Sequence, residues 1–191
     1  MRTFSELTAR DMVWQGDIGL TIPDHGDFHF VLYDRQEAVA TAHVVWQRQG
    51  FFDVTLESGD GVFQSHMDLT RNDRPTLVWR PGEDHSVVSM VVTWEQIIAC
   101  GGSIDTQSGR KLLLEPTHQM GYEYAIFPEG GARIMTLAGP ANSAGAFGGA
   151  NPGHMSIEPA SATDAELPAL VTLAFTVATE EVRLLHQGSR G

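Results

Sequence analysis

The sequence predicts a mostly β protein, a closed antiparallel β-barrel of about 10–12 strands that encloses a hydrophobic C-terminal α-helix. Three observations lead to this prediction. Apolar and polar residues alternate with period two from about residue 28 to 137, as in half-buried strands. Short turn sequences separate these runs about every ten residues, which leaves no room for crossover helices. The last long apolar segment, near residues 169–178, is apolar on every side.

The first four runs indicate which residues face inward. In each run, every second residue is apolar, and valine, threonine and aromatic residues dominate, as pleated sheets prefer. The residues predicted to face the interior are Phe28, Phe30, Leu32, Ala38, Ala40, Ala42, Val44, Trp46, Phe52, Val54, Leu56, Phe63, Met67 and Leu69. Between them, His43 and His66 are expected on the polar face. Further strand-like runs are 76–80, 86–98, 110–116, 122–127 and 132–137.

The connections between these runs favour hairpins. They contain residues that tolerate positive φ or that initiate turns. The clearest examples are Asp34-Arg35-Gln36, Ser58-Gly59-Asp60-Gly61, Ser108-Gly109 and Glu129-Gly130-Gly131, together with the Pro-containing turns at 72–75 and 80–84. A longer Gly/Ala-rich segment, 139–153, is predicted to be a loop, because it offers too little apolar area for a regular element.

Residues 163–187 are predicted to form a buried helix. Thr163 and Glu166 fit a capping box at its start, and Gly188 is a natural stop. Thr172 and Thr176 interrupt its apolar middle, and their hydroxyl groups can bond to carbonyl groups one turn earlier.

The apolar middle of this helix, residues 169–178, motivates the closed barrel. Ten such residues are too few to span a bilayer, so the helix is expected to be surrounded by protein. A flat sheet covers one side only, whereas a barrel covers every side and also removes exposed strand edges.

Length and charge restrict the class of protein. The chain has 191 residues, which predicts a single domain over 1–191. Its 24 acidic and 12 basic residues give a net charge of −12, so no nucleic-acid binding and no stable membrane insertion are expected. The single cysteine, Cys100, excludes an intrachain disulfide, and a soluble cytoplasmic protein is expected.

The order of elements resembles the tubby C-terminal-like superfamily, which includes the plant LURP-one-related proteins and the phospholipid scramblases. The resemblance covers roughly residues 25–187, and its strand–turn–strand units are 101–116 and 121–137, followed by 155–159 and the helix. It implies a barrel threaded by a hydrophobic helix, a binding role and no enzymatic residue. The basic phosphoinositide-binding residues of tubby-like domains are not carried over, because Lys111 is the only lysine.

Metal-ligand residue types gather at one place in the sequence, Asp24, His25, Asp27 and His29. A spacing of four in an extended segment separates the Cα atoms of His25 and His29 by about 13 Å, too far for a shared ion unless the loop folds back. A polar surface loop is therefore favoured over a metal site. No cofactor and no catalytic residue are predicted; the tryptophans and Cys100 are expected to be packing residues.

The leading functional hypothesis is a non-enzymatic binding or interaction module, whose ligand is an unknown protein or small molecule. Three alternatives stay open. The first is a β-barrel carrier of a lipid or small hydrophobic molecule, with the helix as an outer lid. The second is a metal-dependent enzyme with a loop-built site around 24–29 or 139–154. The third is an assembly subunit whose apolar helix is buried by another chain.

Overall fold

The structure is a computed structural model that describes residues 1–7, 11–16, 26–47, 51–68, 75–95, 98–117, 123–138 and 153–188. Within these ranges, the side chains of 26–28, 46–47, 52, 93–95, 98–100 and 180–188 are outside the description. The predicted loop 139–153 falls outside it as well, except for Gly153.

Twelve β-strands are present in the described part of the chain, with one α-helix and two short 3-10 helices. The strands are β1 (Asp11–Gly16), β2 (Gly26–Asp34), β3 (Glu37–Gln47), β4 (Phe51–Ser58), β5 (Gly61–Asp68), β6 (Thr76–Trp79), β7 (Ser86–Glu95), β8 (Ile98–Thr106), β9 (Lys111–Pro116), β10 (Glu123–Pro128), β11 (Met135–Ala138) and β12 (Gly153–Ile157). The helices are η1 (Phe4–Glu6), η2 (Pro159–Ser161) and α1 (Leu167–Gly188).

The strands form a closed antiparallel barrel in which each strand pairs with its neighbours in the sequence. The barrel closes where β1 pairs with β12, with Met12 opposite Met155 and Trp14 opposite Gly153. Closure gives each of the described strands a neighbour on both sides, so none of them lies at an open edge of the sheet. The predicted fold class is confirmed. The closing strand β1 was not predicted, because its six residues carry only a brief alternation around Met12 and Trp14.

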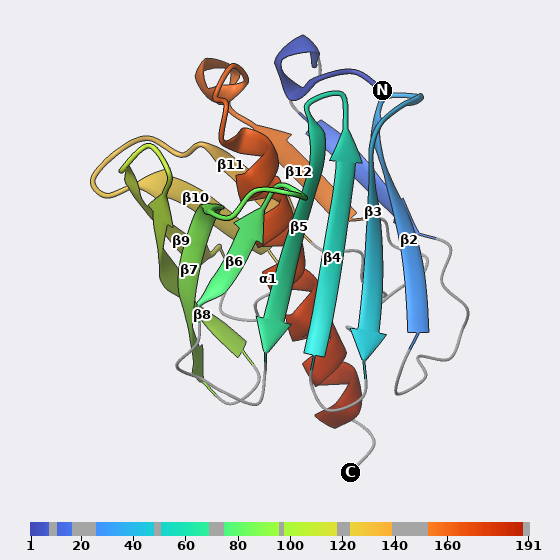
Figure 1. Ribbon diagram of the computed structural model, residues 1–191, viewed down its shortest axis with the longest axis vertical. Helices are drawn as coiled ribbons and strands as arrows, with labels where there is room; N and C mark the ends of the chain where they lie inside the picture. The colour runs from blue at the N-terminus through green and yellow to red at the C-terminus, as the bar shows by residue number, and fades with distance from the viewer. Residues whose placement is uncertain are drawn as a thin grey trace.

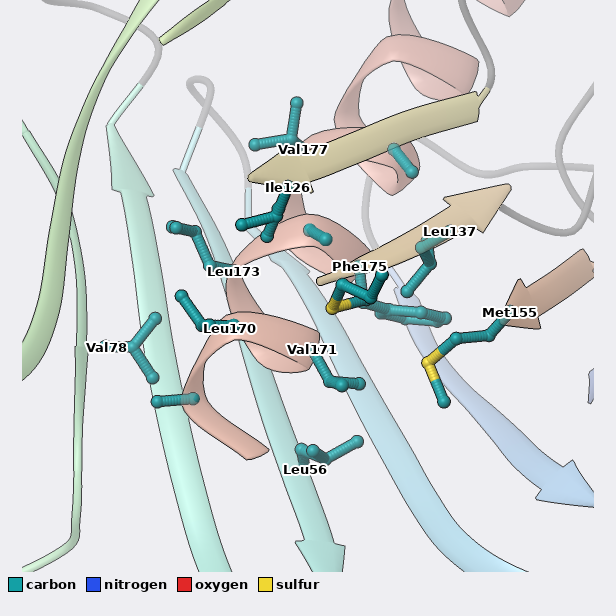
Figure 2. Packing of buried hydrophobic residues seen from close by; sticks show 14 of the residues in the cluster. Leu56, Val78, Ile126, Leu137, Met155, Leu170, Val171, Leu173, Phe175 and Val177 are labelled. Carbon is teal, nitrogen blue, oxygen red and sulfur yellow. The ribbon is translucent and has the colours of Figure 1, made fainter. Parts of the chain in front are cut away.

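Helix α1 runs through the interior of this barrel (Figure 1). Every residue from Leu167 to Thr179 is buried. Figure 2 shows helix side chains pointing toward different walls, with Leu170 toward Val78 of β6, Val171 toward Leu56 of β4, and Phe175 toward Met155 of β12. Residues 169–178 are apolar on every side because the helix contacts the sheet on every side, as predicted.

The buried threonines of the helix satisfy their hydroxyl groups as predicted. The hydroxyl of Thr172 donates to the carbonyl of Pro168 at 2.8 Å, and that of Thr176 donates to the carbonyl of Thr172 at 2.7 Å. Ser65 of β5 also faces inward, and its Oγ lies 2.5 Å from Oγ1 of Thr176. A polar contact therefore links the helix to the barrel wall inside an otherwise apolar core.

The predicted start of the helix is wrong by four residues. The helix begins at Leu167, and Thr163 lies in the turn before it. The expected capping box between Thr163 and Glu166 is replaced by other contacts. The carboxylate of Asp164 accepts the backbone N–H of Glu166 at 3.0 Å, and the Glu166 side chain bonds to the β8–β9 turn. Pro168 is the second helical residue, where its missing N–H costs no intrahelical bond.

A β-bulge corrects one predicted strand face. Between β2 and β3, the register shifts by one residue at Leu32/Tyr33, so that Leu32 pairs with Ala40 while Tyr33 pairs with Ala38. Ala38 is therefore exposed rather than inward, and Val39 and Ala40 are both buried. Beyond the bulge, the predicted alternation is restored. The shifted register pairs Phe30 with Ala42, so the buried side chains of both strands lie on the inner face.

Phe175 is the aromatic residue at the centre of the packing between helix and barrel. Its ring centroid lies 4.5 Å from that of Trp14 and 5.4 Å from that of Phe30. We expect Phe175→Ala to lower the free energy of unfolding by about 3–5 kcal/mol, because it leaves a cavity that the rigid barrel cannot close. Denaturant unfolding followed by tryptophan fluorescence measures this change.

The matched control is Val91→Ala on the outer face of β7, where Val91 is 50% exposed. It is expected to change the free energy of unfolding by about 0.5 kcal/mol or less. A loss below about 1 kcal/mol for Phe175→Ala would contradict the central position of this ring.

Candidate functional site

The described turns gather at the end of the barrel where α1 begins, at the top of Figure 1. These turns join β2 to β3, β4 to β5, β6 to β7, β8 to β9 and β10 to β11. The connections at the opposite end, 17–25, 48–50, 69–74, 96–97, 118–122 and 139–152, lie outside the described residues. The described residues that can form a site therefore lie at the turn end and on the walls of the barrel.

The N-terminal residues are attached to two of these turns. Phe4 is buried, and its backbone N–H donates to the carboxylate of Asp60 at 2.7 Å. The carbonyl of Arg2 accepts the N–H of Gly59 at 3.0 Å, and its guanidinium binds the buried carboxylate of Asp34. A Cβ atom at Gly59 would lie 2.5 Å from the backbone of Arg2, so the close approach requires glycine. This corner of the barrel end is consequently covered.

A groove with a volume of about 720 Å³ opens between the β6–β7 turn, the β8–β9 turn and the start of α1. Its size falls within the range of small-ligand sites, roughly 300–1,000 Å³. The ionisable residues that line it are Arg80, Glu83, Asp84, His85, Arg110, Asp164 and Glu166. Arg80 also lies over the buried ring of Phe63, with 5.0 Å between its Cζ atom and the ring centroid.

Arg110 holds the start of the helix against the β8–β9 turn. Its Nη1 atom lies 2.7 Å from Oδ2 of Asp164, and its Nε donates to Oε2 of Glu166 at 3.0 Å. The other oxygen of Glu166 accepts the backbone N–H of Ser108 at 2.9 Å. Two carboxylates beside a helix N-terminus also interact favourably with the helix dipole. We call Arg110, Asp164 and Glu166 the helix-start cluster.

The helix-start cluster changes the pKa values of its members. Burial acts to raise the pKa of Glu166, but the hydrogen bonds from Arg110 and Ser108 outweigh it and lower the pKa below its ordinary value. For Arg110, burial opposes the charged form, and the hydrogen bonds to Asp164 and Glu166 still raise its pKa. Both groups are therefore held in their charged forms.

The helix-start cluster was not identified from the sequence. Arg110 precedes Asp164 by 54 residues and Glu166 by 56, so no local motif connects them. The available signal was Glu166 just before an apolar helix, which we interpreted as part of a capping box with Thr163.

The segment Ser108–Lys111 has the spacing of the S-x-x-K motif of serine acyl-enzymes, which calls for a serine activated by a nearby lysine. Here it lies in the β8–β9 turn. Nζ of Lys111 instead lies 2.8 Å from Oδ1 of Asp105, in an ion pair whose side chains are both more than half exposed. The hydroxyl of Ser108 lies 3.0 Å from that of Thr106. The motif therefore has a structural role here and carries no argument for acyl transfer.

Most of the sequence-predicted metal cluster lies outside what the structure describes. Asp24 and His25 lie outside the described residues, and Asp27 is in β2 with its side chain outside the description. His29 lies on the exposed face of β2, directly opposite His43 of β3. Among the described residues, no group of three or more metal-ligating side chains is present.

Comparison with protein-family models, with curated proteins and with solved structures finds no match to this chain. The helices in the described part of the chain include none with both the length and the apolar character needed to cross a membrane.

The lowered pKa of Glu166 leads to a pH-dependent prediction. We expect Glu166→Gln to lower the free energy of unfolding at pH 7 by about 1–3 kcal/mol, because it weakens charge-assisted hydrogen bonds. A carboxyl group whose pKa is lower in the folded state stabilises the fold above its unfolded pKa, near the ordinary value of 4.5. That stability is lost as the pH falls through the folded-state pKa.

Urea unfolding of both proteins from pH 7 down to pH 3 measures this effect. The difference between wild type and Glu166→Gln is expected to shrink below about pH 4.5. The exposed Glu115, replaced as Glu115→Gln, is the control and is expected to show little difference at any pH. If the difference in the free energy of unfolding between wild type and Glu166→Gln stayed constant from pH 7 to pH 3, this would contradict the lowered pKa of Glu166.

Proposed function

We propose that this protein is a non-enzymatic binding module of the tubby/LURP-one-like kind, which takes a positively charged ligand in the groove beside the helix start. The observation that carries the proposal is the charge of the groove. It presents four carboxylates, those of Glu83, Asp84, Asp164 and Glu166, against two guanidinium groups, so its net charge is −2.

The distribution of these charges within the groove favours a cationic ligand. Arg110, Asp164 and Glu166 are already paired with one another. The exposed charged groups that are left for a ligand are two carboxylates, Glu83 and Asp84, and one guanidinium, Arg80. Glu83 and Asp84 are exposed on the β6–β7 turn and line the groove. Amine or guanidinium groups of a ligand can donate charge-assisted hydrogen bonds to these carboxylates.

The charge of the whole chain supports the same ligand class. At −12, the protein attracts cations over long distances and increases their rate of association at low ionic strength. The ligand is a small molecule or a segment of a partner protein that carries lysine-like or arginine-like groups.

The occupied interior of the barrel supports a site at its end. Helix α1 fills the space where a barrel of the carrier type would hold a lipid, so the groove beside the helix start is the better candidate. The architecture is also the one implied by the resemblance to the tubby C-terminal-like superfamily. The single Cys100 is compatible with action in the cytoplasm, where disulfides are rare.

Titration of a fluorescently labelled arginine-rich octapeptide, followed by anisotropy, tests the ligand class. We expect it to bind, with an affinity that decreases as salt is added, whereas a glutamate-rich octapeptide does not bind. The double variant Glu83→Gln/Asp84→Asn is expected to weaken binding about tenfold, since each exposed carboxylate contributes up to about 1 kcal/mol.

The control double variant is Glu57→Gln/Glu115→Gln. It removes the same two charges from exposed positions on the strands and is expected to change the affinity by less than about twofold. Equal losses of affinity in both double variants would show that the peptide responds to the overall charge, and would overturn the groove as the binding site. No binding of the basic peptide at low salt would overturn the ligand class.

A further inference from the structure

Two histidines lie side by side on the outer wall of the barrel, away from the groove. His29 of β2 and His43 of β3 are directly opposite each other in the antiparallel ladder. Their ring centroids are 4.4 Å apart, and their planes differ by 4°. His29 is exposed and His43 is half-buried. We call this arrangement the histidine pair.

The β-bulge at the far end of the same hairpin creates the histidine pair. At the turn, Asp34 pairs with Glu37. If the strands continued in this register without the bulge, Ala42 would lie opposite His29. The shift at Leu32/Tyr33 moves the pairing by one residue and puts His43 there instead. Because both strands belong to a closed barrel, their relative position is held by the ladders on either side.

We propose that the histidine pair binds a divalent transition-metal ion of the Cu²⁺, Ni²⁺ or Zn²⁺ class. Imidazole nitrogen is a preferred ligand of these ions, and Cu²⁺ is bound most tightly of the three. Each metal–nitrogen bond is about 2.0–2.1 Å long, so two nitrogens on one ion are about 3 Å apart. The two ring centroids are 4.4 Å apart, so the proposed site requires the rings to tilt until one nitrogen of each reaches this separation.

Each imidazole ring carries two nitrogens, and an ion needs only one of them from each ring. A ligating histidine uses one ring nitrogen for the metal and keeps the other for a protein or water partner. Asp53 adds negative charge nearby. It pairs with Val45 on β3, which makes it a diagonal neighbour of His43, at about 7–8 Å between backbones.

A third histidine on this wall provides the matched control. His66 of β5 lies directly opposite Asp53, and its Nδ1 is 2.6 Å from Oδ1 of that residue. Its ring also stacks on Phe51, with 5.7 Å between the centroids. His66 thus resembles the pair in exposure and strand position, but its described neighbours are a carboxylate and a phenyl ring rather than a second imidazole.

Titration of the full-length protein with Cu²⁺ at pH 7.5, followed by calorimetry and electron paramagnetic resonance, tests the proposal. We expect one ion per chain with two nitrogen ligands in the spectrum. Either His29→Gln or His43→Gln is expected to weaken binding about a hundredfold, because the second imidazole acts at a high effective concentration. His66→Gln and His25→Gln are expected to leave the affinity within about twofold.

Circular dichroism and unfolding curves first establish that each variant is folded, as is expected for substitutions on the outer face. An unchanged Cu²⁺ affinity in His43→Gln overturns the proposal, and it does so whether or not His25→Gln weakens binding. A spectrum with a single nitrogen ligand in the wild type, or an effect of His66→Gln as large as that of His43→Gln, also overturns it. The outcome is independent of the peptide titration, because no residue is shared with the groove.

Discussion

The structure depends on one constraint, which is that an apolar helix must be covered on every side. The segment from Leu167 to Thr179 is buried along its whole length, and only a closed sheet provides walls in all directions at once. Closure then requires β1 to pair with β12, and it removes every free strand edge. From Leu167 to Thr179 the helix in turn packs against the walls, so the described part of the interior is a packed core.

Because the helix occupies the interior of the barrel, the candidate sites lie on the outside of the barrel and at its end. The helix enters at the end where the described turns meet, and the helix-start cluster joins it there to the β8–β9 turn. The same charged residues that hold the helix also form one side of the groove. The proposed binding in the groove would therefore be linked to the attachment of the helix, because a ligand that competes for Asp164 would act on the helix start as well.

Much of the fold could be predicted from the sequence because its signals are local. Alternation identified most strands, turn residues identified the hairpins, and the pattern around Thr172 and Thr176 predicted both burial and the hydroxyl bonds. The errors have local causes too. Ala38 was assigned to the wrong face, because a single-residue bulge has no signature in an alternating pattern. Thr163 was assigned as a cap, because the competing partner of Glu166 lies far away in the sequence.

The sequence by itself determined the class of fold, the burial of the helix and the excess of acidic residues, since each follows from residue type and spacing along one segment. Only the tertiary structure decided which distant residues meet. Arg110 reaches Asp164 and Glu166 because β8, β9 and the helix share one end of the barrel. His29 faces His43 because a bulge sets the register. Such contacts depend on the closure of the sheet and on its exact pairing, which no single segment of the chain encodes.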